Sequence, residues 1–414
     1  MIPAPPNFRR LNARTRCAAS AALSLFLIVS MSSTISRAQN TDAAEQPAAC
    51  FAADQALAAS QWETARSQYE TCLSAGSKHF GSKHFEVLSN LAVALTHLGR
   101  TEEAIQAYRK ALEISSGNPE VRLNLALALI KTENYQASVE QLIQLQNQDP
   151  DNIRVQELLA LCYYHLERYS LSARAAERVN RSHPDDPANA LILGSSYSRM
   201  GLYEKAVPLI AFALKSAGSV EAHYIMGETF LGLRLYKSAL AELSQVAAED
   251  PEFPGLHSAS GVARVGLGDS GGAAAEFARA LNADPTDFEA NYYLGRLKRL
   301  DGARAEAQKY LTKALTSRPA SSEVLFEFAA MAMTDRDYSK AEPLLDKVVR
   351  QQPDHSEAHF LLSQLYNKTG RREAGRKEQE LFEKLRKEQL QRSQSLQGQA
   401  DSADSNASSS PPQP

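Results

Sequence analysis

A spacing of about 34 residues recurs along most of this chain, which has 414 residues in all. Proline marks it at six positions: Pro150, Pro184, Pro251, Pro285, Pro319 and Pro353. Gly218 stands where a proline is due inside the one double interval, and Ser116 stands one period before Pro150. A fixed period of this length is typical of stacked helical hairpins, each of which buries its apolar face only against its neighbours. The spacing therefore predicts an all-α repeat array rather than two or three separate globular domains.

Small residues form two columns when the sequence is aligned on this period. The second column follows the first within each period and runs from Ala65 to Gly375. Two helices approach closely only where side chains are short, so both columns predict the crossing point within each hairpin. The first column contains Ala53, Ala92, Ala126, Ala160, Gly194, Gly227, Gly261, Gly295, Ala329 and Ser363. An aromatic residue also recurs where second helices are expected to begin, at Trp62, Tyr135, Tyr169, Tyr203, Tyr236 and Tyr338.

With these columns the chain resembles the tetratricopeptide repeat family over about residues 46–382. The family pattern combines Leu-Gly, aromatic residues, two alanines and a proline at fixed spacing. One repeat shows most of it in Leu193-Gly194, Tyr197, Ala206 and Ala213. The resemblance implies about ten helical hairpins in a right-handed superhelical solenoid, with the first helices lining a concave groove.

The predicted array ends in a long charged helix from Arg371 to about Arg392, which would cap the last hairpin with a polar face. The tail that follows is rich in Ser, Gln and Pro and cannot bury a core, so we expect it to be disordered. The expected organisation is therefore a leader at 1–38, a solenoid with its capping helix at 39–392, and a low-complexity tail at 393–414.

The leader has the order of a secretory signal peptide. Four arginines (Arg9, Arg10, Arg14, Arg16) precede a short apolar segment, which small residues at Ser36 and Ala38 follow. We expect cleavage after Ala38 and export to the periplasm or the medium. The alternative is an uncleaved anchor, because the uncharged segment from Cys17 to Ser36 could just span a bilayer. No later segment is apolar enough to suggest a membrane span.

The charge balance argues against a nucleic-acid partner. The leader at 1–38 contains five arginines and no acid, so the mature chain would keep 40 basic and 48 acidic residues, a net charge of −8. Nucleic-acid binding depends on basic side chains that neutralise phosphates, and a net negative charge disfavours it.

Two motifs suggest chemistry, and both have a simpler explanation. Gly266–Gly272 fits GxGxxG and GxSxG, but each of those motifs needs a preceding strand, and this stretch falls at the expected turn between two helices. His355, Glu357 and His359 look like a metal site, yet no third ligand at a zinc-like spacing follows. We therefore expect no enzyme activity, no metal and no cofactor.

Cys50 and Cys72 are expected to lie level in the two helices of the first hairpin. An oxidising compartment would favour a disulfide between them. Against it, Cys50 is expected on the groove face rather than toward the second helix, so the sequence leaves the bond open. Cys162 is expected to pack between helices as a free thiol.

Two sets of residues suggest binding. The ends of four consecutive first helices carry a basic ladder, which could hold an anionic polysaccharide or simply favour the helix dipoles: His97, Lys131, His165 and Arg199. By family geometry the groove is lined with apolar residues, which either bind a protein partner or pack within the chain: Leu123, Leu127, Ile130, Leu161, Tyr164, Leu191, Tyr224, Leu231, Tyr292, Phe326, Met333 and Phe360. The interpretation we favour is a scaffold that binds a protein partner in a cell-envelope complex; the alternative is an accessory subunit that binds an anionic polysaccharide.

Overall fold

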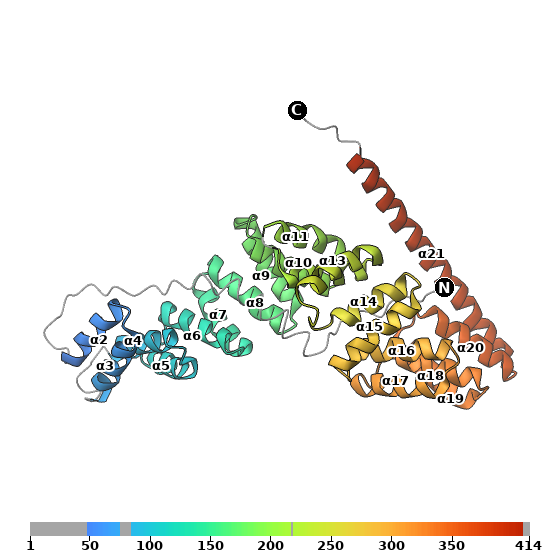
Figure 1. Ribbon diagram of the computed structural model, residues 1–414, viewed down its shortest axis with the longest axis horizontal. Helices are drawn as coiled ribbons and strands as arrows, with labels where there is room; N and C mark the ends of the chain where they lie inside the picture. Colours follow the sequence, from blue (N-terminus) through green and yellow to red (C-terminus); the bar gives the residue numbers. More distant parts are fainter. Residues whose placement is uncertain (1–47, 75–83, 217, 409–414) are drawn as a thin grey trace. The chain divides into compact units, whose positions relative to one another are not determined.

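A computed structural model describes residues 48–74, 84–216 and 218–408 (Figure 1). All of the secondary structure in this part of the chain is helical, and the helices run in antiparallel pairs joined by short turns. The predicted fold class, an all-α array of about ten helical hairpins, is confirmed. The predicted leader at 1–38 lies outside the described residues.

The described helices form two compact units, which divide between Pro254 and Gly255. The first unit contains α2 (Ala48–Ala58), α3 (Trp62–Ser74), α4 (His84–His97), α5 (Thr101–Ile114), α6 (Pro119–Lys131), α7 (Tyr135–Gln148), α8 (Ile153–His165), α9 (Tyr169–Ser182), α10 (Pro187–Arg199), α11 (Tyr203–Ser216), α12 (Val220–Gly232) and α13 (Tyr236–Glu249). The second contains α14 (Leu256–Gly266), α15 (Ser270–Ala283), α16 (Phe288–Leu300), α17 (Arg304–Ser317), α18 (Ser322–Thr334), α19 (Tyr338–Gln351), α20 (Ser356–Lys368) and α21 (Arg372–Ser408).

Local sequence explains where these helices begin and how their turns close. The side chains of Asn118, Asn152 and Asp186 accept hydrogen bonds from backbone N–H groups in the first turn of the helix that follows. The turn inside most hairpins contains one residue with positive φ, such as Gly201 at 77° or Gly268 at 80°. Glycine adopts this conformation without a steric cost, so the chain can reverse within a few residues.

The columns of small residues lie at the helix crossings, as predicted. Every member of the first column from Ala53 to Ser363 is buried. A Cβ atom on Gly261 would lie 2.5 Å from Cε1 of Phe277, and one on Gly295 would lie 2.7 Å from Cγ of Leu311. Glycine at these positions therefore lets a first helix contact a large apolar side chain of its own second helix.

First helices also contact first helices of the next hairpin within each unit, for example α8 with α10 and α10 with α12, or α14 with α16 and α16 with α18. The second helices instead pack between their own first helix and the following one, as α9 does between α8 and α10. Each unit therefore has a row of first helices on one side, and that row carries the residues predicted to bind a partner.

Helix α21 ends later than the sequence indicates. It continues from Arg372 to Ser408, whereas the capping helix was expected to stop at about Arg392 and to be followed by a disordered tail. In the part of the chain that the structure describes, no helix combines the length and apolar character that a membrane span requires.

Candidate functional site

The predicted groove residues divide into buried and accessible side chains. Ile130, Leu161, Tyr164, Tyr224, Leu231 and Tyr292 are buried within the protein. Leu123, Leu127, Leu191, Phe326 and Met333 are half-buried, and Phe360 is exposed. The buried members pack against other repeats, which is the intramolecular alternative that the sequence left open. The accessible members leave apolar surface on first helices α6 and α10 of the first unit and, separately, on α18 and α20 of the second.

In each unit the first helices also bury a carboxylate that the sequence analysis did not single out. Glu327 of α18 is 1% exposed and forms ion pairs with Arg296 and Arg299 of α16. In the first unit, Arg199 Nη2 of α10 lies 3.0 Å from Glu228 Oε2 of α12. Each carboxylate therefore ties one first helix to the next.

A sequence signal for one of these pairs does exist. The position of Glu327 is apolar in neighbouring repeats, where Ile225, Ala259 and Tyr293 occupy it. A lone carboxylate in an apolar column needs a buried partner, because leaving its charge unpaired inside a protein is costly. That reasoning points to a basic residue on an adjacent helix.

The basic ladder is largely occupied by contacts within the chain. The His97 ring stacks on Trp62 with 3.9 Å between ring centroids, and the His165 ring stacks on Tyr135 at 4.2 Å. In both pairs the aromatic residue begins a second helix and the histidine ends the first helix of the next repeat. Arg199 is paired with Glu228. Lys131 is exposed, and the preceding second helix, α5, begins with Thr101 rather than with an aromatic residue that could cover it.

The same position in the repeat after Arg199 is Gly232. A Cβ atom there would collide with the ring of Tyr203, which begins α11. The aromatic column and the ladder column therefore face each other at successive repeat interfaces, and the residue at the end of each first helix fits the ring that packs on it.

The ionisation of the ladder histidines follows from their environment. Burial lowers the pKa of His165 to about 4, because the imidazolium would lose its hydration. Burial, with a smaller contribution from the charge of Lys131, also lowers the pKa of His97. Both rings are therefore neutral at pH 7, and the ladder presents less positive charge than its sequence suggests.

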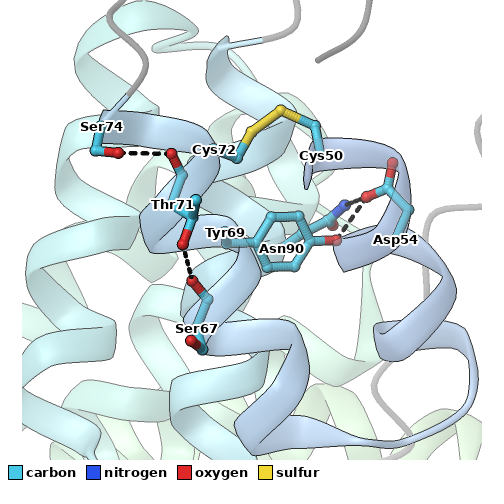
Figure 2. The surroundings of a disulfide bond; sticks show 8 residues. All are labelled: Cys50, Asp54, Ser67, Tyr69, Thr71, Cys72, Ser74 and Asn90. Atoms are coloured by element: carbon cyan, nitrogen blue, oxygen red, sulfur yellow. Dashed lines mark hydrogen bonds between the residues drawn. A yellow bond between two sulfur atoms is a disulfide. The ribbon is translucent and has the colours of Figure 1, made fainter. Parts of the chain in front are cut away.

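The structure joins Cys50 of α2 to Cys72 of α3 by a disulfide, with 5.2 Å between their Cα atoms (Figure 2). Beside it, the hydroxyl of Tyr69 donates to Asp54 Oδ1 at 2.6 Å, which ties α3 to α2 a second time. Contrary to expectation, Cys50 is fully buried between the helices rather than on the groove face. Cys162 is a buried free thiol, as predicted, and burial raises its pKa to about 12.

The two motifs that suggested chemistry have structural roles. Gly266–Gly272 runs from the end of helix α14 through the turn into α15, and Asp269 Oδ1 accepts a hydrogen bond from the backbone N–H of Gly272. His355 caps α20, since its Nδ1 accepts from the N–H of Ala358 at 3.2 Å. His359 points instead at Glu378 and at the carbonyl oxygen of Pro353.

Comparison with known proteins gives the same account of the repeats. One tetratricopeptide repeat model matches residues 95–162 and 332–399, and a second matches residues 52–119, 193–254 and 259–322. Together the two models cover more than half of the chain. The chain belongs to the tetratricopeptide repeat family. Proteins built from tetratricopeptide repeats (TPRs) typically bind other proteins and are usually non-catalytic scaffolds.

Several solved structures are similar to this chain at low sequence identity. A TPR protein from Parabacteroides merdae ATCC 43184 is 13% identical and covers 63% of this chain and 97% of its own, with a TM-score of 0.43. The human IFIT1 dimer with m7Gppp-AAAA is 16% identical and covers 91% and 96%, with a TM-score of 0.46. PilW, a widely conserved type IV pilus biogenesis factor, is 16% identical and covers 50% and 96%, with a TM-score of 0.42. No protein of curated function matches the sequence significantly.

Proposed function

We propose that this protein is an exported TPR scaffold that binds a protein partner on the first helices of its units, within a complex of the cell envelope. The observation that carries the proposal is the set of apolar side chains that these helices leave accessible. Leu123 and Leu127 lie one turn apart on α6, and Leu191 lies on α10 of the same unit. Apolar surface gathered on one face is typical of protein-binding sites.

The second unit has an accessible aromatic pair in equivalent positions of consecutive repeats. Phe326 of α18 is half-buried, and Phe360 of α20 is 37% exposed. Phe360 packs against Phe382 of α21 at 5.1 Å between ring centroids, which fixes its ring at the end of the row. Rigid aromatic side chains are effective anchors for a partner because they lose little conformational freedom on binding.

The basic ladder does not favour the polysaccharide alternative. Two of its members are neutral at pH 7 and stacked on aromatic rings, and a third is paired with Glu228. A single exposed lysine, Lys131, is too little charge to retain an anionic polymer. We therefore put forward protein binding alone.

The test is a crosslinking pull-down from the native envelope fraction with the double variant Leu123→Glu, Leu127→Glu. We expect one protein to be captured by the wild type and lost by this variant, because two carboxylates would replace the apolar surface of α6. The matched control is Ile114→Glu, an exposed isoleucine at the end of second helix α5. Unchanged capture by a folded double variant would refute binding at this surface.

Export and cleavage are tested separately. The leader pattern supports processing after Ala38, so sequencing the N-terminus of the exported protein should find Gln39 first. An intact Met1 would contradict cleavage.

A further inference from the structure

Apolar side chains are exposed at the turns inside two consecutive hairpins of the first unit. Met200 and Leu202 flank the α10–α11 turn and are 36% and 38% exposed. Leu233 and Leu235 flank the α12–α13 turn, where Leu233 is half-buried and Leu235 is 48% exposed. Helix α12 contacts both α10 and α11, so equivalent positions in the two repeats lie about 10 Å apart. We call these four residues the turn patch; it lies at the ends of the helices, apart from the row of first-helix side chains.

Two of these leucines occupy positions where other repeats carry a helix cap. At the equivalent position Asn134, Asp269 and Asp337 each accept a hydrogen bond from a backbone N–H of the second helix. The side chains of Leu202 and Leu235 have no acceptor to offer, and at Leu202 the backbone N–H of Lys205 donates instead to the carbonyl oxygen of Leu202 at 3.1 Å. Arg100, Arg168 and Ala303 also leave their second helices without a side-chain cap, so what distinguishes Leu202 and Leu235 is the apolar surface that they expose.

The cations around the turn patch are also placed against their local preference. Lys205 and Lys237 lie in the first turns of α11 and α13, where the helix dipole favours anions. Arg234 lies in the α12–α13 turn at a φ of 59°, and Arg168 precedes α9 at the position equivalent to Leu202. Within the described chain none of these four exposed cations forms an ion pair; Arg168 donates to Gln136, and Lys205 lies 5.6 Å from the centroid of Tyr197.

The surrounding acids do not balance them. Glu167 and Glu204 are the carboxylates in the same turns, so the rim carries four positive charges and two negative ones. This excess contrasts with the net negative charge of the chain as a whole. A second copy of the chain would bring like-charged rims together at a symmetric contact. A partner with both acidic and apolar side chains would complement the cations of the rim and the apolar centre of the patch.

We propose that the turn patch docks an acidic amphipathic helix of a partner protein. Leucine-type side chains on one stripe of that helix cover Met200, Leu202 and Leu235, and its flanking carboxylates pair with the cations of the rim. This contact is separate from binding on the first-helix row, and it gives the scaffold a second site in the same unit.

The probe is a fluorescent helical peptide of about 18 residues with leucines at i, i+3, i+4 and i+7 and glutamates on both flanks. A second peptide carries lysine in place of each glutamate. We expect the full-length protein to bind the acidic peptide, more weakly as salt rises, and to bind the basic peptide at least about tenfold more weakly.

The decisive variant is Leu202→Asn, Leu235→Asn. Asparagine is a good cap, so this variant should unfold at a higher temperature than the wild type while its affinity for the acidic peptide falls at least about tenfold. The matched control is Leu300→Asn, which makes the same substitution at an exposed leucine in the second unit and should leave binding unchanged. The groove variant Leu123→Glu, Leu127→Glu should also keep its affinity, so the two sites can fail independently.

Three results would overturn the proposal. The first is that the stabilised double variant binds the acidic peptide as the wild type does. The second is that the acidic and basic peptides bind equally, or that neither binds. The third is sedimentation showing that the wild type self-associates through the turn patch, which would make a second copy its occupant.

Discussion

The first described hairpin, α2–α3, and the last, α20–α21, are held together by different chemistry. A disulfide joins Cys50 to Cys72 in the first. In the last, His359 Nδ1 lies 2.6 Å from Glu378 Oε2 and its Nε2 lies 3.0 Å from the carbonyl oxygen of Pro353. One hairpin is closed by a covalent bond and the other by polar contacts to a buried imidazole.

Among the described hairpins the disulfide occurs once, whereas the His–Glu contact recurs inside the array, between His223 and Glu242 in α12–α13 and between His257 and Glu276 in α14–α15. A repeat inside an array is stabilised by both of its interfaces, whereas a terminal one gains from a single interface and needs more from its own hairpin. The disulfide forms only under oxidising conditions, and once formed it does not titrate. The polar contacts of His359 do not depend on oxidation.

Removing the disulfide should have the largest effect. We expect Cys50→Ala, Cys72→Ala to lower the local stability of α2–α3 by about 3 kcal/mol, because the bond closes a loop between residues 22 apart. Hydrogen exchange should show that the amides of α2 and α3 lose protection, whereas the protection of α20 amides stays unchanged. Equal protection in α2 of wild type and variant would mean that Tyr69 and the apolar contacts hold the first hairpin without the bond.

Removing the imidazole should loosen the other end by a smaller amount. His359→Ala leaves Glu378 and the Pro353 carbonyl without their partner, at a cost of about 2 kcal/mol in α20–α21. His359→Asn is the matched control, because Asn291 bonds the carbonyl oxygen of Pro285 at the equivalent position. Exchange in α20 should be fastest for alanine and intermediate for asparagine; identical rates in all three proteins would contradict the comparison.

Acid should produce the smallest effect, at the last hairpin. Burial lowers the pKa of His355 from its ordinary value of 6.5, and its neutral Nδ1 accepts from the N–H of Ala358. Nearby Glu357 and Glu323 oppose this shift, and His359 adds to it. Because the folded pKa is depressed, the contribution is complete above pH 6.5 and is lost as pH falls through the folded pKa, at a cost of about 1 kcal/mol.

The measurement is exchange of α20 amides between pH 7 and pH 5, corrected for intrinsic rates. Helix α2 is the internal reference, since no histidine lies in α2 or α3. His355→Asn, which keeps a cap that does not titrate in this range, should abolish the dependence. A dependence that persists in that variant would assign it to another group.

The repeat architecture could be predicted because it depends on local features. Short side chains such as Gly261 and Ala92 recur at one spacing, and close helix crossings need them whatever surrounds them. The turn at Gly266–Gly272 was predictable for the same reason, because its register follows from the neighbouring repeats.

The candidate site could be predicted only in part because exposure depends on contacts between repeats. Tyr164 and Tyr292 occupy groove positions but are buried by the repeats around them. His165 reads as a cation in sequence and is a neutral ring stacked on Tyr135 in the structure. The disulfide needed the geometry of its own hairpin, which places the Cα atoms of Cys50 and Cys72 within reach.

The facing columns of aromatic and helix-end residues also restrict how such a chain can be rearranged. Tyr203 requires a glycine at the end of the next first helix, whereas Tyr135 packs on the flat ring of His165. Exchanging the repeat that contains Gly232 with the repeat that contains His165 would place the histidine against Tyr203, which leaves no room for a side chain there. The repeats of this chain are alike in backbone but differ in the side chains at the interfaces between them, so their order is itself encoded in the sequence.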